Sequence, residues 1–100
     1  MEIIDFHITE IEGVTYYTVC IDESNSFRGL SFSHEIGLCF ILEDDEAKID
    51  GGWEFNSGGD WNWYKGEENL FEEMHPGYLK ELAEFVIEHG CEVEQNEIQI

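Results

Sequence analysis

Hydrophobic and polar residues alternate in several stretches of the first 64 positions, and this period-2 pattern is typical of half-buried β-strands. Residues 2–11 and 14–22 alternate on either side of the dipeptide Glu12-Gly13, so they predict an antiparallel hairpin with a short turn. The first strand is predicted to direct one set of side chains inward and His7 outward. That inward set is Ile4, Phe6 and Ile8.

Two further strands are predicted between the first hairpin and the middle of the chain. Residues 27–33 alternate and predict one strand. Residues 36–42 form an unbroken apolar run, whose length and composition predict a central strand buried on both faces. Four consecutive acids at 43–46 end this run.

The stretch 51–68 holds all three tryptophans of the protein and predicts a second hairpin. Apolar and polar residues alternate on both sides of 56–59, where Asn, Ser and two Gly residues suit a tight connection. The predicted strands lie near 51–55 and 60–64.

The length of this loop decides which aromatic rings share a face. A four-residue loop places Trp53 and Phe55 on one face and the other two tryptophans, Trp61 and Trp63, on the opposite face. A loop one residue shorter or longer reverses this relation, so the sequence leaves it open. Under the four-residue arrangement, one aromatic pair is either covered by another layer or exposed as an anchor for a partner.

The clearest helix is predicted for residues about 76–89, between Pro76 and Gly90, which suit its first position and the position after its end. Its apolar stripe has helical spacing. The stripe consists of Leu79, Leu82, Ala83, Phe85 and Val86. Residues 67–75 predict one or two helical turns, and 91–100 alternate and predict a final strand. The expected fold class is therefore α+β, an antiparallel sheet of about five to six strands with one main helix packed on it.

The composition fits a single domain that spans residues 1–100. With 42% hydrophobic and 14% aromatic residues, the chain is too apolar for a disordered acidic tail, so a core should form.

Charge narrows the possible partners. The chain has 24 Asp and Glu residues against 4 Lys and Arg residues, a formal net charge of −20. Such a charge repels nucleic-acid phosphates and anionic membranes, so neither is expected as a direct ligand. Self-repulsion also destabilises a compact fold, so the acidity suggests a high-salt habitat, a need for solubility or a strongly basic partner.

Cysteine usage and the first residues indicate a reducing, cytoplasmic location. Cys20, Cys39 and Cys91 are odd in number and lie in apolar, strand-like stretches, which suits small buried hydrophobic residues better than disulfides. The chain begins with acidic rather than basic residues, unlike a signal peptide. No apolar run approaches the roughly 18 residues that a membrane-spanning helix needs.

The motifs of common catalytic and metal sites are missing from the sequence. The four histidines, at 7, 34, 75 and 89, show no zinc-ligand spacing, and the acidic run at 43–50 lacks the calcium-loop pattern. No nucleophile elbow is present either. The sequence therefore predicts a protein that is not an enzyme and has no catalytic residue, metal site or cofactor.

A partner-binding surface is predicted where acids and aromatic rings are interleaved. Residues 43–73 contain eleven acids and two lysines. Acids steer the approach of a basic protein, and a desolvated ring slows its dissociation. The residues predicted to bind the partner are Asp44, Asp45, Glu46, Trp53, Glu54, Asp60, Trp61, Trp63, Glu67 and Glu68. A competing acidic surface is the polar helix face formed by Glu81, Glu84 and Glu88.

In the acidic run 43–46 and the aromatic segments 53–55 and 60–64, the chain resembles small acidic immunity proteins that neutralise bacterial nuclease toxins, including those of contact-dependent inhibition systems. This resemblance implies a single-domain cytosolic inhibitor with no catalytic activity. The leading hypothesis is that the protein binds and neutralises a basic nuclease toxin by occluding its nucleic-acid site. Phage-encoded nucleic-acid mimics, such as anti-restriction and anti-CRISPR proteins, share the same character. An acidic small-ligand-binding domain is the alternative from another class.

Overall fold

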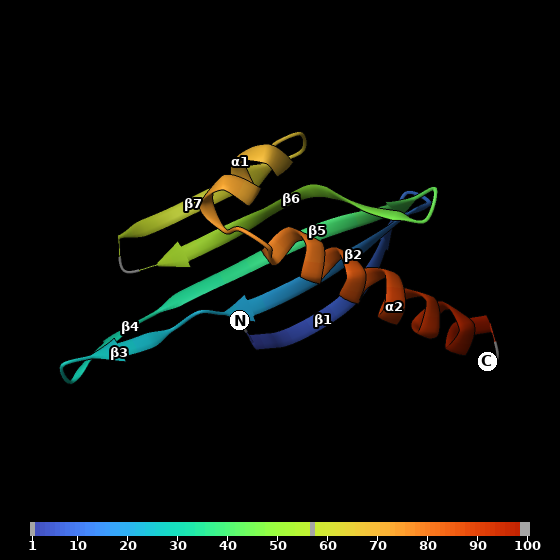
Figure 1. Cartoon of the computed structure of the whole chain (residues 1–100). Coiled ribbons are helices and arrows are strands. Elements are labelled where there is room, and N and C mark those ends of the chain that lie inside the picture. Colours follow the sequence, from blue (N-terminus) through green and yellow to red (C-terminus); the bar gives the residue numbers. More distant parts are fainter. Residues whose placement is uncertain (1, 57, 99–100) are drawn as a thin grey trace.

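The computed structural model describes residues 2–56 and 58–98 of the chain. Five strands form one antiparallel sheet in the order β1-β2-β5-β6-β7, and β3 and β4 form a small hairpin that projects from one end of it (Figure 1). The strands of the large sheet are β1 (Glu2–Ile11), β2 (Val14–Asp22), β5 (His34–Glu43), β6 (Glu46–Asn56) and β7 (Gly59–Tyr64). The other elements are β3 (Asn25–Phe27), β4 (Leu30–Phe32), α1 (Glu68–Met74) and α2 (Tyr78–Ile98).

Both helices lie on the same face of the sheet, with the long helix α2 as the main one (Figure 1). The expected α+β class, an antiparallel sheet with one main helix packed on it, is confirmed. The predicted helical turns at 67–75 correspond to α1.

The core lies between this face and the helices. Alternate residues of the central strands point inward, as the period-2 pattern predicts, and they meet the apolar stripe of α2. The fully buried side chains include Val19, Ile21, Ile36, Leu38 and Phe40 from the sheet and Phe71, Leu82 and Val86 from the helices. Burial of each large apolar side chain stabilises the fold by about 1.5–3 kcal/mol relative to exposure.

The N-terminal hairpin is confirmed, with one local difference. Glu12 and Gly13 connect β1 to β2 with φ angles of 51° and 82°, the left-handed conformations of a two-residue turn that matches the twist of the strands. The expectation for Ile4 is wrong, because an irregularity between Ile3 and Asp5 shifts the register. Ile3 therefore packs against the core, whereas Ile4 is 49% exposed.

The central position predicted for residues 36–42 is confirmed, since β5 is the third strand of five. Burial on both faces is wrong. Phe40 is fully buried on the helix side, whereas Cys39 and Ile41 on the opposite side are only half-buried, because both helices cover the same face. Residues 27–33 also differ from expectation, because Arg28 and Gly29 form a turn between β3 and β4 in place of a single strand.

The predicted final strand at 91–100 is wrong as far as Ile98, because α2 continues to that residue, and 99–100 lie outside the described residues. Gly90 does not end the helix. A Cβ atom at this position would lie 2.8 Å from a ring carbon of Tyr17, so glycine allows α2 to approach β2 closely. The following Glu and Gln residues are good helix formers, which favours continuation.

Neither of the two described helices is both long and apolar enough to cross a membrane. Cys20 and Cys39 are free and half-buried, and burial raises the pKa of both thiols. The side chain of Cys91 lies outside the described ones.

Candidate functional site

The β6–β7 hairpin has the register expected for a four-residue loop. Phe55 pairs with Asp60 and Trp53 pairs with Asn62, and Asn56 also pairs with Gly59. Side chains therefore alternate as expected, with Trp53 and Phe55 on one face and the other two tryptophans on the face that carries the helices.

The three tryptophans have different environments. Trp63 is 2% exposed, and its ring packs edge-on against Phe71 of α1 at a centroid distance of 5.1 Å. Trp61 is 49% exposed, although its ring centroid lies only 5.9 Å from that of Trp63. Trp53 is half-buried on the open face, where its ring occupies the space that a side chain at Gly37 would fill. Of the predicted tryptophan anchors, Trp61 is therefore the one most available to a partner.

The predicted acidic surface is divided between two ends of the sheet. Asp44 and Asp45 form the turn between β5 and β6, next to Glu46, whereas Asp60 lies near the far end of β6. Ten residue steps of about 3.3 Å separate the two ends of this strand, on the order of 30 Å. We call residues 43–46 the acidic turn.

The second region surrounds the outer strand β7. Of its three exposed rings, Trp61 lies on the helix face, whereas Phe55 and Tyr64 lie on the open face with Asp60. Glu67 accepts a hydrogen bond at 2.7 Å from the backbone N–H of Tyr64. We call this region the β7 edge surface. It consists of Phe55, Asp60, Trp61, Tyr64 and Glu67. Glu68 begins α1 close by.

Glu54 and Trp63 lie in the interior, which changes the predicted surface. Glu54 is 3% exposed because it stands opposite Ile36 on β5 and so points toward the helices. Neither residue can contact a partner directly in this structure. Glu54 instead forms the centre of a polar cluster.

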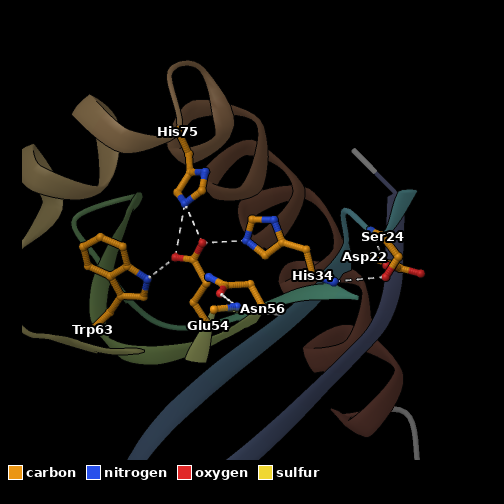
Figure 2. A network of polar contacts seen from close by, with 8 residues as sticks. Asp22, Ser24, His34, Glu54, Asn56, Trp63 and His75 are labelled. Atoms are coloured by element: carbon orange, nitrogen blue, oxygen red, sulfur yellow. Dashed lines mark hydrogen bonds and ion pairs between the residues drawn. The ribbon is translucent and has the colours of Figure 1, made fainter. Parts of the chain in front are cut away.

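In this cluster, the Glu54 carboxylate binds three side-chain nitrogens (Figure 2). His34 Nε2 lies 2.6 Å from Oε1, and His75 Nε2 lies 3.0 Å from Oε1 and 3.2 Å from Oε2. Trp63 Nε1–H donates to Oε2 at 3.2 Å. Burial raises the pKa of Glu54, but the hydrogen bonds from both histidines and Trp63, with the charge of His75, outweigh burial and lower it. The carboxylate therefore stays charged while buried.

Each histidine is positioned by its own segment. His34 begins β5 and pairs with Asn56, and its backbone N–H donates to Ser24 Oγ at 3.1 Å. His75 follows α1, and its backbone N–H donates to the Phe71 carbonyl at 2.8 Å.

The His75 ring is held by the aromatic residues beside it. It lies 5.0 Å from the Phe71 ring and stacks on Tyr78 at 5.5 Å. Tyr78 is held in turn by a side-chain hydrogen bond with Glu23, which raises the pKa of the Tyr78 hydroxyl. Two aromatic rings thus restrict the orientation of the His75 imidazole.

Sequence reasoning missed this cluster, because its three ionisable members are far apart in the chain and match no known spacing. One signal was present. In the hairpin register, Glu54 falls on the same face as Trp61 and Trp63, and His34 is in phase with the buried Ile36. An acid and a histidine at inward positions need polar partners.

A cavity lies at the other end of the sheet, near the acidic turn. Its volume is about 580 Å³, and residues from both adjoining hairpins and from α2 line it. Among them are Val14, Tyr17, Leu42, Asp44 and Ile87. If the protein is instead an acidic small-ligand-binding domain, this cavity is the candidate binding site.

Comparisons of the chain with protein-family models, with curated proteins and with solved structures found no match.

Proposed function

We propose that this protein is an acidic inhibitor that binds a basic, nucleic-acid-processing protein and occludes its nucleic-acid site. A nuclease toxin, with this chain as its immunity protein, is the first candidate for the partner. The second candidate partner is a restriction or CRISPR nuclease, in which case this chain is a phage-encoded nucleic-acid mimic. The observation that carries the proposal is the exposed Trp61 on an outer strand of a chain with a net charge of −20.

The β7 edge surface supplies the anchor. Aromatic side chains that are exposed in the free protein and buried in the complex dominate many interfaces, because they desolvate a large area at low entropic cost. Trp61 rests against the buried Trp63, so its ring is already partly ordered before binding. Two further exposed rings, Phe55 and Tyr64, lie on the opposite face of the same hairpin, so aromatic side chains flank both faces of this sheet edge.

The acids supply steering and selectivity. Asp60 pairs with Phe55 across the hairpin, and Glu67 contacts the backbone of Tyr64, so negative charge borders the exposed rings. A basic protein is attracted to such a surface, and an acidic one is repelled. The acidic turn, about 30 Å away, acts through the long-range field rather than through the same contact.

The backbone of the acidic turn is consistent with selection for charge. Among the described residues, three two-residue hairpin turns place both residues at positive φ: Glu12-Gly13, Arg28-Gly29 and Asp44-Asp45. Glycine adopts this conformation without a steric penalty, whereas a residue with a Cβ atom is disfavoured there. Asp45, with φ of 64°, takes the position that glycine holds in the other two turns. An acid at this position sacrifices stability and adds negative charge.

The test begins with affinity capture from the source cell, using the whole chain as bait, and continues with kinetics on the purified partner. We expect Trp61→Ala mainly to speed dissociation, at a cost of about 2 kcal/mol, which is roughly 30-fold in Kd. We expect Asp60→Lys mainly to slow association, and this effect should shrink in high salt. Excess nucleic acid should compete with binding of the unsubstituted protein.

Two control variants locate the surface. Leu30→Ala removes an exposed apolar side chain from the β3–β4 hairpin and should leave the kinetics unchanged. The triple Lys variant at Glu81, Glu84 and Glu88 tests the competing helix face. If only that variant loses binding, the β7 edge surface is the wrong site. A captured partner that still binds its nucleic acid in the complex would refute occlusion.

A further inference from the structure

The His34–Glu54–His75 cluster has the composition and convergence of a metal site. Two imidazole nitrogens and one carboxylate oxygen approach one another so that all three donor atoms lie within 4.8 Å. The donors come from β5, from β6 and from the residue after α1, so the tertiary fold alone brings them together. From this geometry we infer that the cluster binds a divalent transition-metal ion of the Zn²⁺ class.

The donor set selects the class of ion. Imidazole nitrogen suits Zn²⁺ and its first-row neighbours, whereas Mg²⁺ and Ca²⁺ prefer oxygen ligands. Three protein ligands of the His₂Glu type leave one position of a tetrahedral ion for water or a small ligand. The 28% exposed side chain of His34 leaves the cluster open to solvent on that side.

The distances are close to those that an ion requires. Donors about 2.0–2.1 Å from a tetrahedral Zn²⁺ lie about 3.3 Å from one another. His75 Nε2 is 3.0 Å from Glu54 Oε1, and His34 Nε2 is 2.6 Å from the same oxygen. To bind the ion, the distance from Glu54 Oε1 must therefore grow by about 0.7 Å to His34 Nε2 and by about 0.3 Å to His75 Nε2, and the two imidazole nitrogens, which lie within 4.8 Å of each other, must adopt the same spacing. The ion takes the place of the protons that lie between these rings and the carboxylate.

The surroundings resemble the support that metal ligands have in proteins. Trp63 Nε1–H donates to Oε2 of Glu54, which orients the carboxylate and leaves Oε1 toward both imidazoles (Figure 2). The aromatic rings of Phe71 and Tyr78 fix the plane of His75. The net charge of −20 raises the local concentration of cations around the whole protein.

The inference is independent of the proposed inhibitor function, since no residue of the cluster belongs to the β7 edge surface. It also differs from loose binding of cations to the exposed acids, which use oxygen alone. Two properties should distinguish the site: one ion per chain, and resistance to an excess of Mg²⁺.

The test is a competition between the protein and a chromophoric chelator for Zn²⁺, with Mg²⁺ in excess. We expect one bound Zn²⁺ per chain, and we expect His34→Ala and His75→Ala each to weaken binding by more than about tenfold. His7→Ala is the matched control, because it removes an exposed histidine that pairs with Asp5 at 3.3 Å on β1. This variant should bind like the unsubstituted protein.

A second measurement covers the case in which a variant does not fold. In nuclear magnetic resonance spectra of the unsubstituted protein, Zn²⁺ should shift the ring signals of His34 and His75 and leave those of His7 in place. Zn²⁺ binding that excess Mg²⁺ abolishes, or that both cluster variants retain at full strength, would overturn the inference. Ring signals of His34 and His75 that do not respond to Zn²⁺ would overturn it as well.

Discussion

Strand β6 has carboxylates near both of its ends, in opposite environments. Glu54, near one end, is buried and accepts hydrogen bonds from His34, His75 and Trp63. Asp44 and Asp45, just before the other end, are exposed at a turn with positive φ. A buried charge is tolerated only where donors replace its hydration, whereas exposed charges keep their water and act through the field that they create. Net charge alone therefore does not say what any one acid does.

The largest expected effect separates these two kinds of acid. Glu54→Ala should destabilise the fold by about 3–5 kcal/mol, because it leaves two histidines and an indole N–H without their shared acceptor in a buried place. Glu46→Ala, at the exposed start of the same strand, should change stability by less than about 0.5 kcal/mol. Urea unfolding in the presence of a chelator measures the free energy of unfolding of both variants without any contribution from metal binding. Equal effects would show that Glu54 is not held as its contacts indicate.

A smaller difference is expected between two neighbouring tryptophans on the same face. Trp63→Phe keeps an aromatic ring but removes volume and the N–H donor to Glu54, so it should cost about 1–3 kcal/mol. Trp61→Phe changes a half-exposed ring and should stay within about 0.5 kcal/mol. The comparison uses the same substitution two residues apart, measured by denaturant unfolding. A larger loss at Trp61 would contradict its assignment to the surface.

The acidic turn should become more stable when it receives the residues that its backbone favours. Asp44→Asn combined with Asp45→Gly should stabilise the fold by about 1 kcal/mol, since Asn-Gly is the preferred pair for this turn. The variant in which both positions become Asn removes the same two charges while keeping a Cβ atom at 45. The difference between the two variants isolates the backbone contribution. No gain from glycine would mean that the turn is not strained by Asp45.

The smallest effect concerns charge as a whole. The melting temperature should rise by several degrees between low salt and about 0.5 M NaCl, because screening reduces repulsion among the exposed acids. Asp44→Lys combined with Asp45→Lys lowers the net negative charge and should reduce this salt dependence. A melting temperature that stays flat or falls would show that self-repulsion does not limit the stability of the fold.

Much of the fold could be predicted because side-chain periodicity is a local property. The two-residue repeat located β1, β2, β7 and the second half of β6, whose first half, residues 46–50, was not predicted as a strand. The helical stripe located the start of α2 to within two residues. The failures have local causes that hydrophobicity does not reveal. At Ile4 an irregular register shifts the strand, and at Gly90 the contact with Tyr17, rather than a helix end, requires glycine.

The candidate sites were less predictable, since they depend on distances across the fold. The sequence could not tell which of Trp53, Trp61 and Trp63 is the exposed anchor, because the exposure of each ring depends on where the helices pack. Local sequence patterns could not predict the Glu54 cluster. Its two histidines lie 20 and 21 residues from Glu54, on opposite sides of it in the chain. They meet only because β5 pairs with β6 in one register and α1 folds back over that sheet face.

The order of strands in the large sheet has a consequence for self-association. β1 and β7 are its outer strands, and the outer strands of a sheet offer unpaired backbone groups to which another copy can add. At low ionic strength, a net charge of −20 on each molecule keeps copies apart. The same salt that relieves repulsion within one molecule also relieves it between molecules. Stability and resistance to aggregation should therefore move in opposite directions as salt rises.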